Sequence, residues 1–417
     1  MSNLIDYIFW RGDIPFDVSP WNEVDGLLCA TLSYLNFHGL EDHRGWTLRE
    51  AKRIDLLIEG QGNMFPLRKK MFEGMAESER FGESRMHHFI ALTDEDVSMQ
   101  FSAMCVDLPD GAMAVIFRGT DNTLVGWRED FNMSYQTTVP GQLAAAYYLS
   151  KAARLSDRPI RLMGHSKGGN LAVYAGAAVP ERIQKRIEGI WTYDGPGMNL
   201  EISRSEGYAR IRDRIHSYIP QTSIIGMLME YYKPYTVVHS TAKGLEQHDP
   251  MTWQVYGTRF EEMESVDRTA SVVCETLHEM LTNSTPEKRG AFVDTLFRLA
   301  DNTNATRMSD ILNEKFRSLV KMAGGRKEVE PETRRVFTRL MAQAVTLGVG
   351  NVVERVRGKS EQDGPDEWST LDPAEAQEIQ EKIAEPAPET PPAPAKKTRK
   401  KKTEEKSESD LDKSGDV

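Results

Sequence analysis

The stretch Gly164-His165-Ser166-Lys167-Gly168-Gly169 constrains the fold of this chain more than any other segment. A short apolar run at residues 160–163 predicts a buried strand before it, and residues 171–178 are small and helix-compatible. A strand that turns sharply into a helix needs glycine two residues before and two residues after the turn, because a Cβ there would collide with the backbone. The segment therefore predicts a nucleophile elbow with Ser166 exposed at its tip. The alternative is a glycine-rich turn that holds a serine without a chemical role.

Length and composition restrict the class of protein. The 417 residues leave room for two domains or one enlarged domain, and the net charge of -11 makes general affinity for nucleic acid unexpected. Three widely separated cysteines predict a reducing compartment rather than a disulfide framework or a metal site. The first residues do not have the features of a signal peptide, and no apolar run has the length that crosses a bilayer. The sequence therefore predicts a cytoplasmic protein.

Strands alternate with helices around the elbow. Residues 99–106 and 112–117 are strand-like and are joined by a Pro-Asp-Gly turn, which predicts a β-hairpin. The other predicted strands are 189–193, 214–219 and 235–240, and the predicted helices are 22–37, 47–57 and 142–155. This alternation predicts an α/β fold with a mainly parallel sheet and helices on both faces.

Three parts are expected along the chain. Residues 1–258 hold the sheet and the N-terminal helices, and residues 259–357 have a helical pattern that predicts a helical appendage. Residues 358–417 are charged and proline-rich with few apolar side chains, which predicts a disordered tail. The run from Lys396 to Lys402 carries six basic residues in seven. It is either a solvated segment or a weak contact with anionic membranes.

An attacking serine hydroxyl needs a histidine that takes its proton and a carboxylate that orients the histidine. In this type of fold the histidine follows the last strand, and His248 has that position, whereas His239 lies within the preceding strand and is better explained as structural. Asp194 ends the strand after the elbow and is the candidate acid, with a turn-capping role as the alternative. Asp249 is better explained as a cap before Pro250.

The oxyanion formed in acyl transfer needs two N–H donors, of which Lys167 supplies one at the helix start and the loop after residues 112–117 supplies the other. Phe117-Arg118-Gly119-Thr120, Trp127 and Asp130, taken with the elbow, resemble the pattern of class 3 lipases from about residue 112 to residue 199. In that family the residue that matches Thr120 forms the oxyanion hole. The resemblance implies the same role for Thr120.

A second resemblance covers more of the chain. The helix around Asn22-Glu23-Val24-Asp25, the segment 217–248 and the helical end are similar to the bacterial Mbeg1-like (DUF2974) proteins, a branch of the same group. Two positions depart from class 3 lipases. Ser223 stands where those lipases have the acid, and Lys167 replaces an apolar residue. The acid is therefore relocated to Asp194 or absent.

These resemblances imply an α/β-hydrolase that cleaves carboxylic esters through an acyl-Ser166 intermediate, with an acyl lipid or another apolar acyl compound as substrate. No cofactor or metal is expected. Two alternatives stay open at this point. One is a thioesterase or peptidase with the same site. The other is a binding or scaffolding protein that keeps the elbow but lacks an effective triad, which Ser223 favours.

Overall fold

A computed structural model describes residues 2–37, 44–53, 58–59, 64–121, 123–229, 234–268, 270–271 and 285–301. The chain divides into two compact units, Met1–Asp363 and Gly364–Val417, and all of the described residues belong to the first. The predicted tail, including the run from Lys396 to Lys402, and most of the predicted appendage lie outside the described residues. Among the helices that are described, none is both long and apolar enough to cross a membrane.

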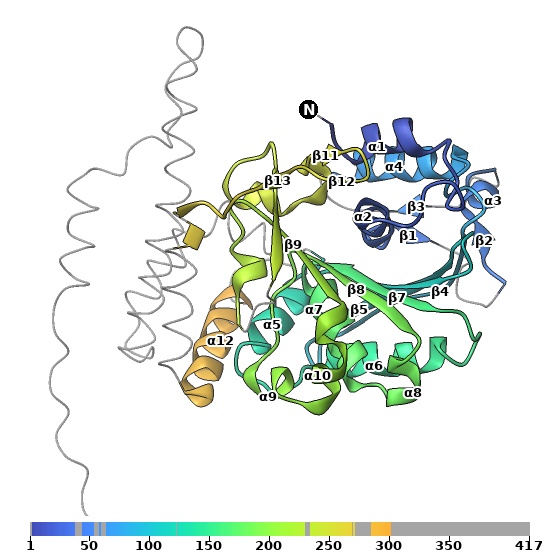
Figure 1. The fold of residues 1–417 in the computed structure, drawn as a ribbon. Helices are drawn as coiled ribbons and strands as arrows, with labels where there is room; N and C mark the ends of the chain where they lie inside the picture. The colour runs from blue at the N-terminus through green and yellow to red at the C-terminus, as the bar shows by residue number, and fades with distance from the viewer. Residues whose placement is uncertain are drawn as a thin grey trace, which may run out of the picture. The chain divides into compact units, whose positions relative to one another are not determined.

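A mixed sheet is the centre of the fold (Figure 1). Within the described residues it has nine strands in the order β13-β10-β9-β8-β7-β6-β5-β4-β2. Strands β6 to β10 run parallel to one another, and the strands on either side of them are antiparallel. The strands of this sheet are β2 (Trp46–Thr47), β4 (Arg85–Asp94), β5 (Met99–Asp107), β6 (Met113–Phe117), β7 (Ile160–His165), β8 (Ile187–Tyr193), β9 (Ile215–Pro220), β10 (Tyr235–Val238) and β13 (Glu262–Met263). Two small ribbons pair β1 (Asn36–Phe37) with β3 (Ile58–Glu59), and β11 (Val255–Tyr256) with β12 (Arg259–Phe260).

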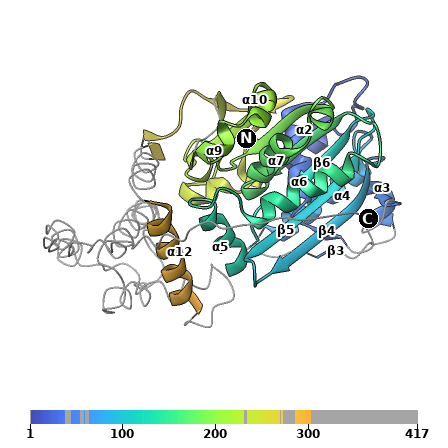
Figure 2. The same cartoon turned by 90° about the horizontal axis from the view of Figure 1, so that it is seen from below.

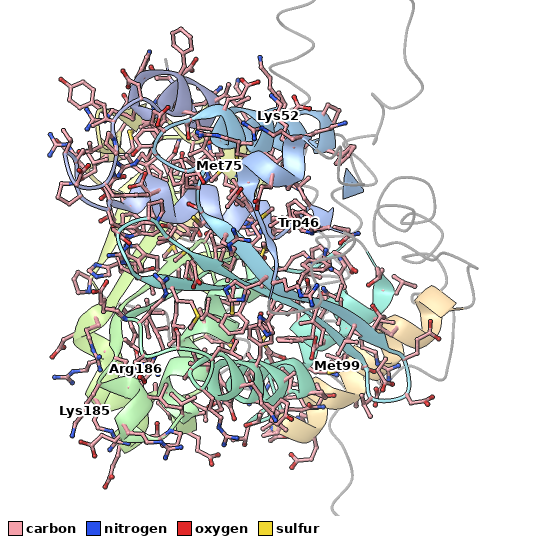
Figure 3. All side chains as sticks on the ribbon, turned by 90° about the vertical axis from the view of Figure 1, so that its right-hand side faces the viewer. Trp46, Lys52, Met75, Met99, Lys185 and Arg186 are labelled. Atoms are coloured by element: carbon pink, nitrogen blue, oxygen red, sulfur yellow. The ribbon has the colours of Figure 1, made fainter. Side chains whose placement is uncertain are left out.

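Helices cover both faces of the sheet, as predicted (Figures 1 and 2). One face carries α1 (Leu4–Arg11), α2 (Glu23–Leu32), α3 (Leu48–Arg53) and α4 (Phe65–Glu77). The other carries α5 (Leu124–Asn132), α6 (Pro140–Ala152), α7 (Lys167–Ala178), α8 (Glu181–Gln184), α9 (Leu200–Ser203) and α10 (Glu206–Ile211). In Figure 3, Lys52 and Met75 lie in the first layer, and Lys185 and Arg186 lie beyond the opposite face.

Alternation along the strands produces two cores. Met163 of β7 packs into the core under α2, whereas its neighbour Leu162 packs into the core under α7. Ile116 and Val115 of β6 divide in the same way. Successive side chains of a strand point to opposite faces, so a sheet buried on both sides has almost continuous apolar strands.

The helix starts follow local sequence signals. The Asn22 side chain accepts the N–H groups of Val24 and Asp25, and the Asp25 carboxylate accepts the N–H of Asn22. This reciprocal cap starts α2 where the sequence predicts it. The helix ends at Leu32 rather than at residue 37, because the chain then enters β1. Thr47 and Glu50 form the predicted capping pair at α3.

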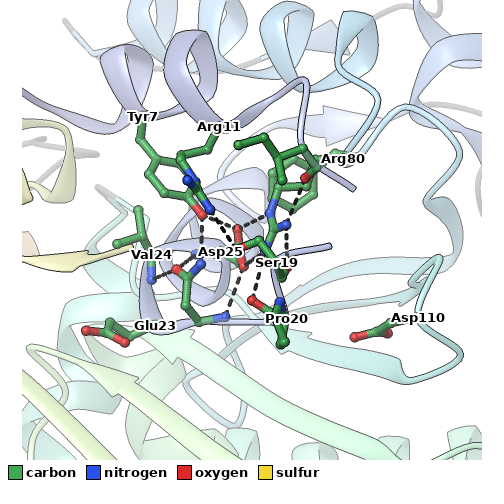
Figure 4. Close-up of polar contacts among 12 residues, drawn as sticks. Tyr7, Arg11, Ser19, Pro20, Glu23, Val24, Asp25, Arg80 and Asp110 are labelled. Carbon is green, nitrogen blue, oxygen red and sulfur yellow. Dashed lines mark hydrogen bonds and ion pairs between the residues drawn. The ribbon is translucent and has the colours of Figure 1, made fainter. Parts of the chain in front are cut away.

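A buried ion pair fixes the first helical layer (Figure 4). Arg80 contacts Asp25 through two nitrogens, at 2.8 Å for Nε and 2.5 Å for Nη2, and both side chains are fully buried. Tyr7 donates its hydroxyl to Asp25 at 2.7 Å, and Arg80 also donates to the carbonyl groups of Ile14, Ser19 and Pro20. Each buried charge therefore faces an opposite charge and further hydrogen-bond partners, which offset the cost of removing the two charges from water. The cluster joins α1, α2 and the segment after α4.

The start of the appendage was predicted wrongly. Residues 259–263 do not begin a helix: they form β12 and β13, and β13 adds to the central sheet next to β10. The alternation of apolar residues is too short there to distinguish a strand from a helix. The helix α12 (Pro286–Asp301) does begin at the predicted cap. It lies against α5, where Arg128 Nη2 is 3.0 Å from Asp294 Oδ1 and the Phe131 and Phe297 rings meet edge to face.

Candidate functional site

The strand, sharp turn and helix predicted around Ser166 are present. β7 ends at His165, α7 begins at Lys167, and Ser166 between them has φ 58° and ψ -133°. A non-glycine residue with this backbone conformation is strained, and such strain concentrates at functional sites. An added Cβ at Gly164 would collide with the backbone of Gly168, which explains the need for glycine at this position.

Two neighbouring parallel strands bring Asp194 next to Ser166. His165 of β7 and Tyr193 of β8 are register partners, so the residues that follow them, Ser166 and Asp194, leave the same edge of the sheet. The Ser166 N–H donates to the Tyr193 carbonyl at 2.9 Å. Asp194 is 1% exposed and also has a positive φ, 48°. Adjacent chain reversals therefore place a serine and a buried carboxylate side by side.

His248 reaches this edge from the last residue of a short 3-10 helix, η3 (Gly244–His248), which follows β10. Its Nδ1 lies 2.6 Å from Oδ2 of Asp194. A carboxylate can only accept, so Nδ1 carries the proton and Nε2 is left as the ring nitrogen that accepts one. Within the described residues no hydrogen bond joins the Ser166 hydroxyl to the His248 ring. Such contacts are often long when no substrate is bound.

Ser223 and Asp194, the two positions at which the sequence could place the acid, are in direct contact. Ser223 donates its hydroxyl to Oδ1 of Asp194 at 2.5 Å, and the N–H of Gly226 donates to the same oxygen at 3.1 Å. The other oxygen of Asp194 faces His248. The side chain at the position where class 3 lipases have an acid thus contacts the carboxylate that the sequence proposed as its replacement.

A buried histidine links the elbow to the loop of His248. Nε2 of His165 lies 2.7 Å from the His248 carbonyl, and Nδ1 lies 2.6 Å from the Tyr34 hydroxyl. The carbonyl only accepts, so Nε2 is the protonated nitrogen and Nδ1 accepts from Tyr34. Burial lowers the pKa of His165 well below its usual value, which keeps the ring neutral. The two histidine rings are 4.5 Å apart between centroids.

The loop after β6 lies directly against Ser166. A Cβ added to Gly119 would lie 3.1 Å from the Ser166 Cβ, so the backbone of this loop approaches the serine closely. Thr120, the next residue, donates its hydroxyl to Oδ2 of Asp130. Burial raises the pKa of Asp130 to about 6. Thr120 therefore follows a residue whose backbone lies against Ser166, and Lys167 follows Ser166 as the first residue of α7.

The Lys167 side chain is buried and lies against α5 and β5. Its Nζ lies 2.9 Å from Oε2 of Glu129. The sequence marked Lys167 as unusual but did not identify Glu129, because no local spacing connects the two residues. The same holds for Tyr34 and His165, which are 131 positions apart.

His239 and Asp249, for which the sequence favours structural roles, both have structural contacts. Nδ1 of His239 is 3.1 Å from the Glu261 carboxylate. Asp249 accepts the Met251 N–H at 3.0 Å and caps the short 3-10 helix η4 (Pro250–Thr252). Among the described residues, no three His, Cys, Asp or Glu side chains are grouped as a metal ion would require.

This chain is similar to several solved lipase structures and to one protein family. Three solved structures are similar at 15% sequence identity: M37 lipase (TM-score 0.31, 48% of this chain and 67% of the other), lipase II from Rhizopus niveus (0.28, 43% and 74%) and a lipase from Rhizopus microsporus var. chinensis (0.30, 53% and 76%). No curated protein matches the sequence. A family described as Mbeg1-like matches residues 75–298, more than half of the 417 residues.

Proposed function

This chain belongs to the Mbeg1-like family, and we propose that it is a serine hydrolase that cleaves carboxylic esters of acyl lipids or other apolar acyl compounds. The observation that carries the proposal is the 2.6 Å contact between Nδ1 of His248 and Oδ2 of Asp194, beside the strained turn at Ser166. Serine, histidine and aspartate converge at one edge of the sheet. These three side chains can supply a nucleophile, a base and an acid that orients the base.

In the proposed reaction, Oγ of Ser166 attacks the ester carbonyl carbon while Nε2 of His248 takes the hydroxyl proton. Asp194 keeps accepting from Nδ1 and stabilises the imidazolium that forms. The tetrahedral intermediate then expels the alcohol, which receives the proton from Nε2. Water then attacks the acyl carbon of acyl-Ser166 while Nε2 of His248 takes its proton, and the acyl C–Oγ bond breaks as Nε2 returns that proton to Oγ, which releases the carboxylic acid and restores Ser166.

The main-chain N–H groups of Thr120 and Lys167 are the proposed donors to the oxyanion. The close approach of Gly119 to Ser166 supports the position of Thr120, and the place of Lys167 as first residue of α7 supports the second donor. The hydrogen bond from the Thr120 hydroxyl to Asp130 holds the loop. Donors that are fixed before the reaction stabilise developing charge without reorganisation.

Hydrolysis of soluble p-nitrophenyl esters tests the proposal. Ser166→Ala should lose about 10⁴-fold or more in turnover because the nucleophile is gone. Ser203→Ala is the matched control, since this serine only donates to the carbonyl of Leu200 in α9. Equal activity of Ser166→Ala and wild type would reject Ser166 as the nucleophile.

The alternative is a hydrolase-fold binding protein without effective catalysis. Ser223 at the usual acid position favours it. This alternative predicts that the wild type shows no more ester hydrolysis than Ser166→Ala. A thioesterase would instead cleave matched thioesters faster than oxygen esters.

A further inference from the structure

The ammonium group of Lys167 is completely satisfied inside the protein. Its Nζ lies 2.7 Å from the Gln100 carbonyl, 2.7 Å from Oε1 of Gln100 and 2.9 Å from Oε2 of Glu129. An ammonium has three donors, and these three acceptors use all of them. The lysine side chain is 1% exposed and that of Glu129 is fully buried. The position of Nζ is therefore fixed by three directed hydrogen bonds as well as by the attraction between the two charges.

Glu129 extends this contact to two further backbone groups. Its Oε2 also accepts the Gln100 N–H at 3.1 Å, and its Oε1 accepts the Gly141 N–H at 2.6 Å. An added Cβ at Gly141 would lie 2.7 Å from Oε1, so a larger residue there would displace the Glu129 carboxylate from its present contacts. A single carboxylate thus joins β5, α5, the start of α6 and the first residue of α7.

The next residue of α5 holds the other candidate oxyanion donor. Asp130 accepts the Thr120 hydroxyl, and Glu129 accepts the Lys167 ammonium. Gly126, one turn earlier, faces the same region: a Cβ there would lie 2.9 Å from Cγ2 of Thr120. Consecutive carboxylates of one helix therefore hold the side chains of Thr120 and Lys167, the two candidate oxyanion residues.

Stability alone does not explain an ion pair here. Burial of two charges carries a large desolvation penalty, and apolar side chains of similar volume often stabilise a fold equally well or better. An ion pair with three directed hydrogen bonds provides what apolar packing does not, namely one fixed position for the attached backbone.

We propose that the buried Glu129–Lys167 ion pair is a positioning device for the oxyanion hole, which fixes the Lys167 N–H relative to the Thr120 N–H through α5. This inference rests on the proposed hydrolase function. Glu129 and the side chain of Lys167 act through the backbone of the site: Glu129 is a positioning residue, and the Lys167 side chain positions the N–H of its own residue. Their contribution is confined to the step in which negative charge develops on the substrate oxygen.

The test compares three variants that remove charge from the pair with one that breaks an unrelated pair. Lys167→Met and Glu129→Gln each leave one buried charge without its partner, and the double variant leaves neither. Arg80→Met is the matched control, because Arg80 and Asp25 form an equally buried ion pair in the other helical layer. Each variant is measured for melting temperature, kcat and KM on one soluble ester. A lower kcat with an unchanged KM indicates the loss of an interaction that is made only in the transition state. A higher KM with an unchanged kcat indicates the loss of binding that the bound substrate already has.

The expected result is a fall of kcat by about 10- to 100-fold in Lys167→Met, with KM within about 3-fold of the wild type, because the donors act mainly in the transition state. The double variant should melt at a higher temperature than either single variant but keep the low kcat. Arg80→Met should lose melting temperature and keep kcat in its folded fraction.

Three results would overturn the inference. They are an unchanged kcat in folded Lys167→Met, a loss that falls on KM, and recovery of kcat together with stability in the double variant. If the single variants do not fold, the double variant alone decides, through its kcat. An inactive wild type would overturn the proposed function and the positioning role together, whereas an active wild type with unaltered variants would overturn the positioning role only.

Discussion

Nδ1 of His248 lies 2.6 Å from Oδ2 of Asp194, although the two residues are 54 positions apart. The contact exists because Asp194 follows β8 and His248 ends a short helix after β10, at the same edge of the parallel part of the sheet. Residues at the carboxyl ends of parallel strands meet at one edge, which is where open α/β folds build their sites.

Replacement of the acid tests the role of this contact. Asp194→Asn should lower turnover on soluble esters by about 10⁴-fold, because the amide favours the wrong imidazole tautomer. Wild-type activity of Asp194→Asn, together with an inactive His248→Ala, would mean that another acid, or none, orients the base.

Ser223 allows a second-site rescue. Its hydroxyl is 2.5 Å from Oδ1 of Asp194, so a carboxylate at residue 223 would lie close to the one that has been lost. Ser223→Asp in the Asp194→Asn background should recover part of the activity, whereas Ser223→Asn in the same background should not. Equal activity of the two double variants would show that position 223 cannot supply the acid.

The buried His165 predicts a pH-dependent stability. Its pKa is lowered in the folded state by burial, while the unfolded chain takes up a proton near pH 6.5. Its contribution to stability is therefore complete above pH 6.5 and is lost as the pH falls below that value. The wild type should lose about 1.4 kcal/mol of unfolding free energy per pH unit relative to His165→Gln in this range. Urea unfolding of both proteins at pH 5, 6, 7 and 8 measures this difference, and parallel curves would contradict it.

Removal of one partner of the Asp25–Arg80 ion pair should lower the free energy of unfolding strongly. Arg80→Met leaves the Asp25 carboxylate buried with only neutral donors, which typically costs about 3–5 kcal/mol. Arg80→Met combined with Asp25→Leu should be less destabilised than Arg80→Met alone, because no charge stays buried. Urea unfolding measures both, and a double variant less stable than the single would argue against an unpaired charge as the cause.

The tail offers a prediction outside the described residues. If the run from Lys396 to Lys402 contacts anionic headgroups, truncation after Lys359 should reduce co-sedimentation with anionic vesicles at low salt, by about 1 kcal/mol of binding free energy per basic residue lost. High salt should remove the difference through screening. Hydrolysis of soluble esters should not change. Equal sedimentation of both proteins at low salt would leave the tail as a solvated segment.

Local signals in the sequence were sufficient for the elbow, the caps of α2 and α3 and the hairpin of β5 and β6. In each case the determinant lies within a few residues, such as Gly164 and Gly168 around Ser166. The strand β4 was not predicted, and its register shifts between His87 and Ile90, which breaks the period on which strand recognition depends. The helix α4 was also missed, although its buried residues Met71, Phe72, Met75 and Ala76 have helical spacing that could have revealed it.

Contacts between distant residues are the part of the site that the sequence could not supply. Lys167 and Glu129 are 38 positions apart, and neither local pattern points to the other. Their pairing depends on how α5 packs beside the elbow, which is a property of the whole fold. The same reasoning applies to the hydrogen bond from Tyr34 to His165.

Covalent labelling of Ser166 tests the central proposal most directly. The protein is treated with a fluorophosphonate, digested, and the modified peptide is located by mass spectrometry, in the wild type and in Ser166→Ala. A base-activated serine should form one phosphonyl adduct on Ser166 in the wild type and none in the variant, and His248→Ala should slow its formation strongly. An unlabelled Ser166, or an adduct that forms equally fast without His248, would contradict a serine hydrolase built on this site.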